Sequence, residues 1–254
     1  MASAPAARFA GRYALVTGGA SGFGAGIVRR FLEEGATVAI ADRDRAGAAA
    51  LASELGAAAF ALEADVSCEL AMRQLAESFF ARCPRIDILV NNAGVGHLPA
   101  ALDELCVEEF DRLLAVNSRS VFLAARAFVP AMKRVRGGVI LNIASTGGVR
   151  PRPRLTWYNA SKGWMISATR AMAIELAEFR IRVNAINPVA GDTPLLATFM
   201  GEDTPEARAR MIASIPLGRL SQPADIAAAA AYLCSDDAAM VTGVALEVDG
   251  GRCI

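Results

Sequence analysis

Short apolar segments alternate with longer amphipathic segments along almost the whole chain, and this alternation constrains the fold more than any other feature. The apolar segments predict buried strands; they lie at 13–17, 37–42, 59–63, 86–91, 138–143, 182–186 and 244–248. The spacing of apolar residues predicts helices between them, near 24–34, 43–55, 68–82, 107–133, 157–178 and 223–234. Strands that are apolar throughout and separated by helices predict a seven-stranded parallel sheet covered by helices on both faces.

The length of the chain fits one domain of this class. Its 254 residues include 54% hydrophobic residues, which is enough to bury a substantial core. No linker, repeat or low-complexity stretch divides the chain, so we expect a single domain over residues 1–254. Residues 193–216 break the alternation and contain Pro194, Pro205 and Pro216. A long irregular segment at this place is typical of a binding loop, and we expect a substrate lid there.

Charge and composition exclude several classes of partner. The formal net charge is zero, and no block of like charge occurs, which argues against nucleic acid or a membrane surface as the main partner. No apolar run reaches the ~20 residues of a membrane span, and the first residues lack the pattern of a secretory signal. The five cysteines form no Cys-x-x-Cys pair, so we expect free thiols in a reducing cytoplasm. The single histidine, His97, argues against a His-based metal site, and we predict no metal.

A tyrosine and a lysine four residues apart suggest acid/base chemistry. Of the 26 basic residues only Lys133 and Lys162 are lysines, and Tyr158 is one of three tyrosines. On a helix, Tyr158 and Lys162 share a face one turn apart. A phenol beside an ammonium gives an acid/base from a side chain that normally titrates near ~10. An ordinary surface pair would show the same spacing.

A glycine-rich turn follows the first predicted strand. Residues 17–24 read Thr-Gly-Gly-Ala-Ser-Gly-Phe-Gly and open the first predicted helix. Glycine lets the backbone approach a pyrophosphate, and a helix N-terminus supplies free N–H groups, although ordinary tight turns also use glycine. Asp42, at the end of the second strand, could bind ribose hydroxyls and repel a 2′-phosphate, which favours NAD(H) over NADP(H). Arg43 could receive that phosphate, so NADP(H) remains an alternative.

Together these features closely resemble the short-chain dehydrogenase/reductase family over the whole chain. Ser145 lies 13 residues before Tyr158, a separation common in that family. The matching motifs are Thr17-Gly18…Gly22-Phe23-Gly24, Asp65-Val66, Asn91-Asn92-Ala93-Gly94, Asn117, Ser145, Tyr158-x-x-x-Lys162 and Asn187-Pro188…Thr193. The resemblance implies a doubly wound, Rossmann-type α/β fold. It also implies a homotetramer, with a homodimer as the alternative, in which the helices near 107–133 and 157–178 pair across one interface.

The resemblance further implies a role for each matching residue. Tyr158 would be the general acid/base, and Lys162 would lower its pKa and bind the nicotinamide ribose. Ser145 would hydrogen-bond the substrate oxygen, and Asn117 would hold a water that passes protons to solvent. The cofactor-binding residues would be Gly18, Ser21, Gly22, Phe23, Gly24, Asp42, Arg43, Asp65, Val66, Asn92, Ala93, Gly94, Tyr158, Lys162, Val189, Gly191 and Thr193.

The chain departs from the family pattern at two positions. Phe23 stands where isoleucine is usual, and Val189 stands where glycine usually follows the proline, with Gly191 two residues later. The backbone contact to the nicotinamide is therefore expected to be rearranged, while Thr193 still matches.

The substrate is the least determined part. Arg150, Arg152 and Arg154 alternate with prolines between Ser145 and Tyr158, and they could bind a carboxylate or phosphate. A Pro-stiffened surface loop is the alternative interpretation. His97, near the expected mouth of the site, is a further candidate substrate contact.

We therefore predict an NAD(H)-dependent oxidoreductase that interconverts a small secondary alcohol and a ketone by hydride transfer. One rival is an NADP(H)-dependent 3-oxoacyl reductase, which Asp42 disfavours. The other is a non-catalytic nucleotide-sensing protein, which would have no need to keep Ser145, Tyr158 and Lys162.

Overall fold

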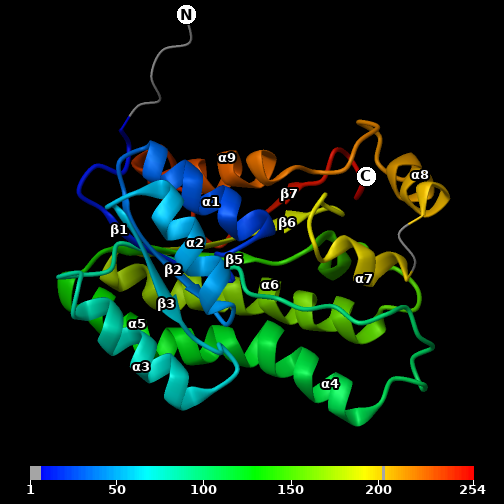
Figure 1. The fold of residues 1–254 in the computed structure, drawn as a ribbon, viewed down its shortest axis with the longest axis horizontal. Coiled ribbons are helices and arrows are strands. Elements are labelled where there is room, and N and C mark those ends of the chain that lie inside the picture. Colours follow the sequence, from blue (N-terminus) through cyan, green and yellow to red (C-terminus); the bar gives the residue numbers. More distant parts are fainter. Residues whose placement is uncertain (1–6, 202–203) are drawn as a thin grey trace, which may run out of the picture.

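The computed structural model describes residues 7–201 and 204–254, and within them seven parallel strands form one sheet (Figure 1). The strand order is β3-β2-β1-β4-β5-β6-β7. The strands are β1 (Tyr13–Thr17), β2 (Thr37–Asp42), β3 (Ala59–Glu63), β4 (Ile88–Asn91), β5 (Gly138–Ile143), β6 (Ile181–Pro188) and β7 (Ala245–Val248). The order turns back beside β1, which defines a doubly wound Rossmann-type sheet and confirms the predicted fold class.

Helices cover both faces of the sheet (Figure 1). One face packs against α1 (Gly22–Glu33), α2 (Arg45–Leu55) and α9 (Pro223–Cys234) through a cluster that includes Ile27, Leu51 and Ile226. The other packs against α3 (Glu69–Phe80), α5 (Ser120–Val135) and α6 (Thr156–Leu176) through a cluster that includes Phe79, Phe128 and Leu176. The central strands β1, β2, β4 and β5 are buried on both sides, so their sequences are mostly apolar rather than alternating, whereas the edge strands β3 and β7 are less buried.

The structure differs from the sequence prediction in two segments. The helix predicted at 107–133 is interrupted, because a π-helical turn (Ala115–Arg119) separates α4 (Val107–Leu114) from α5. The irregular segment expected at 193–216 contains two short helices, α7 (Leu196–Met200) and α8 (Pro205–Ala213). Residues 202 and 203 of that segment, and residues 1–6 of the expected domain, lie outside the described residues. In the described part, no helix has the length and hydropathy needed to cross a membrane.

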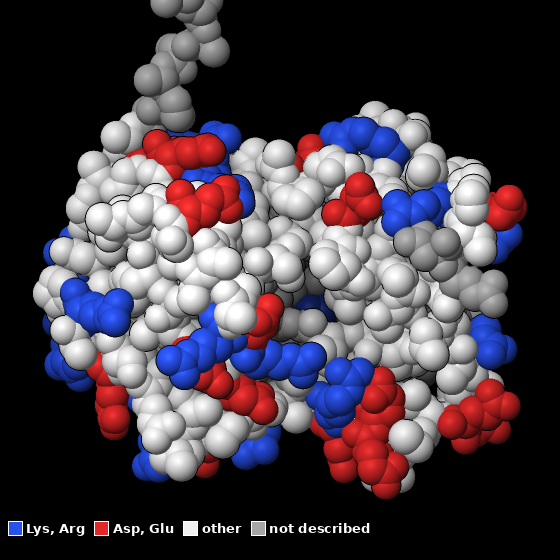
Figure 2. Space-filling view, viewed as in Figure 1, with Lys and Arg blue, Asp and Glu red and all other residues white. Residues whose placement is uncertain are grey.

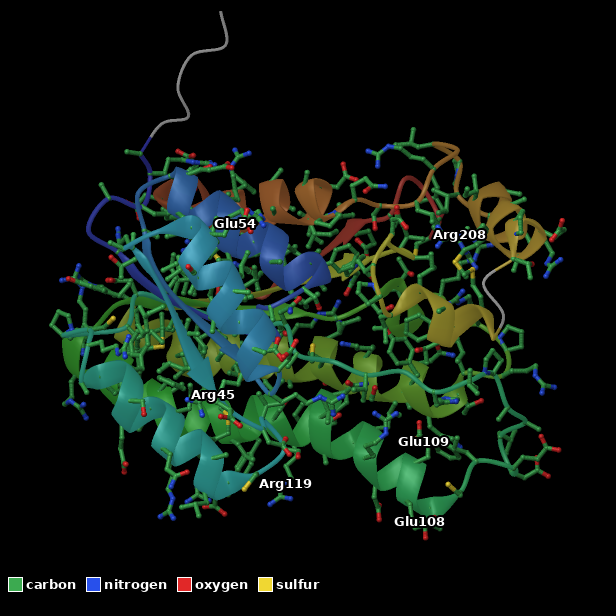
Figure 3. All side chains as sticks on the ribbon, in the orientation of Figure 1. Arg45, Glu54, Glu108, Glu109, Arg119 and Arg208 are labelled. Atoms are coloured by element: carbon green, nitrogen blue, oxygen red, sulfur yellow. The ribbon has the colours of Figure 1, made fainter. Side chains whose placement is uncertain are left out.

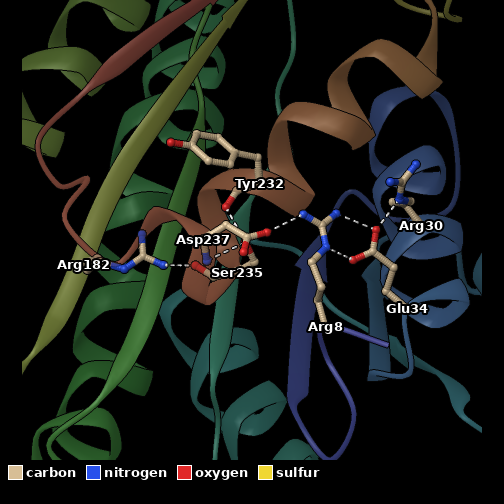
Figure 4. A network of polar contacts seen from close by, with 7 residues as sticks. All are labelled: Arg8, Arg30, Glu34, Arg182, Tyr232, Ser235 and Asp237. Atoms are coloured by element: carbon tan, nitrogen blue, oxygen red, sulfur yellow. Dashed lines mark hydrogen bonds and ion pairs between the residues drawn. The ribbon is translucent and has the colours of Figure 1, made fainter. Parts of the chain in front are cut away.

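A buried ion cluster joins the start of β1 to α1 and to the turn after α9 (Figure 4). The Glu34 side chain is only 1% exposed and accepts hydrogen bonds from Arg8, at 2.7 Å to each oxygen, and from Arg30. Arg8 also pairs with Asp237, at 3.1 Å. Burial opposes ionisation of Glu34, but the hydrogen bonds from Arg8 and Arg30 outweigh it and lower the pKa of Glu34.

Replacing Glu34 by alanine should destabilise the protein by about 2–3 kcal/mol at neutral pH, because it leaves Arg8 and Arg30 without their buried partner. Since the pKa of Glu34 is lowered from 4.5, its contribution is complete above about pH 5.5 and is lost as the pH falls through the lowered pKa. Urea unfolding at pH 7 and pH 4 measures both effects. Glu33→Ala, at the exposed neighbouring position, is the control; equal losses for both variants would contradict the role given to burial.

Candidate active site

A cleft of about 650 Å³ opens at the carboxyl edge of the sheet. Figure 2 shows a hollow in the middle of the face of the molecule that is drawn there, with basic side-chain atoms visible inside it. It extends from the glycine turn to the segment that carries α7 and α8. Of the residues predicted for the site, those lining the cleft are Gly18, Ser21, Gly22, Phe23, Asp42, Arg43, Asp65, Val66, Asn92, Ala93, Gly94, His97, Ser145, Arg150, Arg152, Tyr158, Lys162, Val189, Gly191 and Thr193.

The glycine turn brings bare backbone to one wall of the cleft. Gly18 and Gly22 have φ angles of +62° and +53°, which disfavour other residues. A Cβ at Gly18 would lie 2.8 Å from the Cα of Ala93. Ser21 precedes α1 without capping it through its side chain, and the first turn of α1 has no acidic residue. The N–H groups and positive potential at this helix start are therefore available to an anion.

Gly24, which was predicted to contact the cofactor, lies behind the glycine turn instead of in the wall of the cleft. It does not line the cleft, and a Cβ there would overlap the carbonyl oxygen of Gly18 and the amide of Asn92. The Asn92 Nδ2 donates to the carbonyls of Thr17 and Gly18, at 2.9 and 2.8 Å. Gly24 thus allows α1 to approach the turn closely, and Asn92 fixes the turn.

Two carboxylates border the far end of the cleft. Asp42 accepts hydrogen bonds from the N–H groups of Ala20, through Oδ2, and of Asp44, through Oδ1, both at 3.0 Å. This ties the end of β2 to the glycine turn and holds Asp42 at the cleft wall. Asp65 accepts from the hydroxyl and the N–H of Ser67, and these bonds lower the pKa of its carboxyl.

Ser145, Tyr158 and Lys162 meet on the opposite side of the cleft, as their order in the sequence predicted. Tyr158 and Lys162 lie in the first turns of α6, 6% and 4% exposed. The Lys162 Nζ donates to the carbonyl of Ile143 at 2.9 Å and lies 5.9 Å from the centre of the Tyr158 ring. Ser145 follows β5, and its Oγ accepts from the N–H of Gly147 at 3.0 Å.

The pKa of Tyr158 is shifted in the direction opposite to the one expected from the sequence. Burial raises the pKa of Tyr158 above 10, although the Ser145 side chain and the charge of Arg152 act to lower it. Burial also lowers the pKa of Lys162 to about 8. The sequence predicted a lowered Tyr158 pKa with Lys162 as the cause. In this structure desolvation dominates for both groups, and the opposing positive charge at Tyr158 comes from Arg152.

Asn117 lies behind the cleft rather than in its wall. It is fully buried in the π-helical turn, and its side chain pairs with both main-chain groups of Val95, at 2.9 Å each. Its Nδ2 also donates to the Ser161 hydroxyl at 3.1 Å. The side chain that was expected to hold a proton-relay water is thus already used, and it fixes the loop after β4 against α6. A Cβ at Gly94, 3.3 Å from the Lys162 Nζ, would crowd the same place.

Phe23, one of the two departures from the family pattern, packs against Gly191 in the turn after β6. A Cβ at Gly191 would overlap the ring of Phe23, so the larger side chain at position 23 fits because residue 191 has none. Gly191 also bridges to Ser221. The methyl side of Thr193 lies close to Gly22, where a Cβ would be 3.3 Å from its Cβ. The glycine turn and the turn after β6 therefore close on one another across the cleft.

The three candidate substrate residues have different surroundings. Arg150 donates to the main-chain oxygens of Arg252 and Ile254, at 2.7 and 3.1 Å. The guanidinium of Arg152 lies 5.8 Å from the centre of the Phe199 ring. His97 is buried, and its Nδ1 lies 2.8 Å from the carbonyl oxygen of Leu98. Because a carbonyl only accepts, Nδ1 carries the proton, which makes Nε2 an acceptor in the neutral ring. That buried Nε2 has no partner among the described residues.

Sequence reasoning missed several residues of the substrate end of the cleft. Glu109 and Arg112 form a bidentate pair on α4, at 2.6 and 2.8 Å, and Arg112 also donates to the Gly96 carbonyl. Figure 3 shows Glu109 on the side of α4 that faces the body of the molecule and Glu108 on the outer side. Phe199 of α7, by contrast, belongs to the lid expected at 193–216, and it packs on the Tyr158 ring with centroids 4.8 Å apart. Arg252 arrives from the far end of the chain, and no local pattern marks it.

These residues fit a bound dinucleotide. The bare glycine backbone and the unneutralised start of α1 suit a pyrophosphate, and the Asp42 carboxylate in the cleft wall would accept hydrogen bonds from ribose hydroxyls. Lys162 supplies N–H donors at the other end, beside Tyr158 and Ser145. When bound there, a nicotinamide ring supplies the site that gives or accepts a hydride.

Comparison with known proteins agrees with this geometry. A family model described as Enoyl-(Acyl carrier protein) reductase matches residues 18–252. The chain is 47% identical over 243 residues to 4-formylbenzenesulfonate dehydrogenase of Comamonas testosteroni, an alignment covering 94% of this chain and 96% of that protein. It is 39% identical over 247 residues to L-fucose dehydrogenase of Bos taurus, covering 96% and 90%.

A solved structure is also closely similar. The crystal structure of 3-ketoacyl-(acyl-carrier-protein) reductase from Brucella melitensis complexed with NADH superimposes with a TM-score of 0.93 and 52% identity, covering 96% of this chain and 99% of that one. The fold and the cleft define an oxidoreductase built on a Rossmann-type sheet. The chain belongs to the short-chain dehydrogenase/reductase family, whose dehydrogenases use nicotinamide cofactors.

Replacing Lys162 by methionine should stabilise the fold while removing activity. A pKa lowered from 10.5 to about 8 corresponds to about 3 kcal/mol of unfavourable burial at pH 7. Losing the hydrogen bond to Ile143 offsets about 1 kcal/mol of this, so a net gain of about 1–3 kcal/mol is expected. The cost to the native enzyme is complete below pH 8 and disappears as the pH rises toward 10.5, so the gain should shrink over that window.

Chemical denaturation at pH 7 and pH 10 measures this gain. Lys133→Met, at the other lysine of the chain, is the control and should not stabilise the protein, because Lys133 is less buried and contacts the Phe179 ring. Destabilisation by Lys162→Met at pH 7 would show that the ammonium is favourably placed after all.

Proposed function

We propose that this protein is an NAD(H)-dependent dehydrogenase that interconverts a small alcohol, most simply a secondary alcohol, and its carbonyl compound. The observation that carries the proposal is the meeting of Ser145, Tyr158 and Lys162 on one wall of a cleft whose other wall fits a dinucleotide. The name of one relative, L-fucose dehydrogenase, supports this reaction class, because a sugar offers hydroxyl groups for oxidation.

Each residue has a chemical role in the proposal. Tyr158 takes the proton of the alcohol as phenolate, or gives it to the carbonyl oxygen in the reverse direction. Ser145 orients that oxygen by a hydrogen bond. Lys162, held by Ile143, binds the nicotinamide ribose and favours the phenolate. Because burial raises the pKa of Tyr158, positive charge near the phenol must offset that effect during turnover. Asn117 is a positioning residue that holds the loop after β4.

The preference for NAD(H) over NADP(H) rests on Asp42. Its carboxylate is fixed at the cleft wall by two backbone N–H groups, so it cannot easily turn away from a 2′-phosphate. The NADH complex of the Brucella melitensis protein, 52% identical to this chain, is consistent with this preference.

A second candidate is reduction of a 3-oxoacyl thioester, because that structural relative is named a 3-ketoacyl reductase. The same Ser-Tyr-Lys group would serve it. NADH oxidation with acetoacetyl thioesters, compared with oxidation of simple secondary alcohols, separates the two.

Three further expectations also belong to the proposal. The segment with α7 and α8 would be the substrate lid, since Phe199 already contacts Tyr158. A homotetramer is supported by apolar side chains exposed on α5 and α6, namely Phe122, Trp164 and Ile174. A cytoplasmic location is supported by the five free thiols.

Replacing Tyr158 by phenylalanine should lower kcat with any accepted alcohol by about 10²–10⁴-fold, because the general acid/base is removed. NADH binding, followed by fluorescence titration, should change less than about threefold, since the cofactor wall of the cleft is intact. Turnover within tenfold of the native enzyme would refute the mechanism, whereas loss of NADH binding as well would indicate a damaged fold.

Replacing Asp42 by asparagine should reduce discrimination between the two cofactors. The native enzyme is expected to prefer NAD to NADP by at least about tenfold in kcat/KM, and the variant should narrow that ratio by about tenfold or more, because the charge that repels a 2′-phosphate is gone. Glu63→Gln, at the exposed end of β3, is the matched control. A native preference for NADPH would overturn the assignment.

A further inference from the structure

Arg152 is a cation in the cleft whose charge has no partner. Its side chain is partly buried beside Tyr158 and Phe199, and among the described residues no carboxylate or carbonyl oxygen accepts from its guanidinium. Only its main-chain carbonyl is used, by the Nδ2 of Asn159 at 2.8 Å. Burial lowers the pKa of Arg152, and the interaction with Tyr158 that acts to raise it does not offset the removal of the charge from water.

A second arginine comes from the other end of the chain. Arg252 lines the same cleft as Arg152, and its charge acts to lower the pKa of Arg152, so the two charges interact across the cleft. The segment around Arg252 is held firmly. Arg150 donates to its main-chain oxygen at 2.7 Å, and Asp249 accepts from the N–H groups of Gly251 and Cys253, at 2.9 and 2.7 Å.

Among the described residues that line the cleft, no unpaired carboxylate balances the two arginines at the substrate end. Glu109, the acidic residue lining that end, is already bound by Arg112 through both oxygens. Asp42 and Asp65 border the opposite end, at the carboxyl ends of β2 and β3, where they accept other hydrogen bonds. Two like charges held together in a partly dry cleft repel each other, and an anion bound between them removes that cost.

We propose that the substrate is a small organic acid, a carboxylate or sulfonate, whose anionic group is held by Arg152 and Arg252 while its alcohol or carbonyl group reaches Ser145 and Tyr158. The planar guanidinium groups suit two-pronged binding of oxyanions. Phe199, stacked near Arg152 and in contact with Tyr158, offers an apolar surface for the carbon skeleton between the two polar ends. This inference rests on the proposed dehydrogenase function and specifies its substrate class.

The neighbouring arginines have other tasks. Arg150 also lines the cleft, but its guanidinium donates to the main-chain oxygens of Arg252 and Ile254 and so anchors that segment. Arg154 is exposed, does not line the cleft, and its guanidinium reaches only the carbonyl of Pro99, at 3.4 Å. Arg154 is therefore a matched control in the same loop.

The test compares three probes of one shape with NAD: 4-(1-hydroxyethyl)benzoate, 4-(1-hydroxyethyl)benzenesulfonate and neutral 1-phenylethanol. The native enzyme should prefer the anionic probes by at least about tenfold in kcat/KM. Arg152→Gln should lower the ratio of anionic to neutral kcat/KM by about 10–100-fold, mainly through KM, and Arg252→Gln should lower it in the same direction. The ratio is the readout because Arg152 also acts on Tyr158. Arg154→Gln should leave the ratio unchanged.

A binding measurement separates this inference from the proposed function. Calorimetric titration of the enzyme–NADH complex with benzoate, benzenesulfonate and acetophenone detects the anion site without turnover. Arg152-dependent binding of the anions, with no oxidation of any alcohol, would support the site and overturn the dehydrogenase assignment. A neutral preference in the native enzyme, or equal ratios in the native and Arg152→Gln enzymes, would overturn the anion site, and comparing benzoate with benzenesulfonate shows which oxyanion it prefers.

Discussion

A chain of three buried polar side chains sets the geometry on which the site depends. Asn91, at the end of β4, donates to Asn142 of β5 at 2.8 Å, and Asn142 donates to Thr169 of α6 at 2.9 Å. All three are buried, so breaking one bond would leave polar groups without water. These hydrogen bonds fix the ends of β4 and β5 and the helix α6 relative to one another. The loop after β4 follows the first, Ser145 follows the second, and α6 carries Tyr158 and Lys162. The distances between Ser145, Tyr158 and Lys162 therefore depend on these buried polar contacts within an otherwise apolar core.

The wall of the cleft has the opposite character, because its cations are poorly compensated. Lys162 has one carbonyl partner and a pKa lowered to about 8, and Arg152 has no acceptor for its guanidinium among the described residues. Where a carboxylate is buried away from the cleft it is paired with arginine, as Glu34 is with Arg8 and Arg30. Unpaired buried charge reduces stability, and it is useful only where a ligand supplies the missing anion or hydroxyl. Within the cleft, Arg112 and Arg150 have partners that hold the structure together, whereas Lys162 and Arg152 are the cations left for a ligand.

The sequence was sufficient for whatever depends on local pattern. Apolar strands, the glycine turn and the Ser145–Tyr158–Lys162 spacing follow from periodicity and residue chemistry, and the structure brings the three residues together. What depends on contacts between distant segments was not predictable. The side chain of Asn117 is hydrogen-bonded to the main chain of Val95, and the absence of a side chain at Gly24 allows the carbonyl of Gly18 to approach it. Both contacts depend on how the loops fold and have no local sequence pattern. Arg252 reaches the cleft through Arg150, more than a hundred positions away in the chain, and a π-helical turn interrupts a segment whose apolar spacing reads as one helix.

The position of Arg152 links recognition of the proposed acid to the chemistry at Tyr158. Its positive charge acts to lower the pKa of a phenol that burial raises. An oxyanion bound to Arg152 neutralises part of that charge, so the phenolate loses some of its support when an acidic substrate binds. Arg252, whose charge also faces Arg152, offsets the loss by sharing the anion. A single arginine that bound the anionic group of the substrate could no longer lower the pKa of Tyr158 with its full charge. With two arginines, one in a segment fixed by Arg150 and Asp249, the anion can be bound while positive charge remains beside Tyr158.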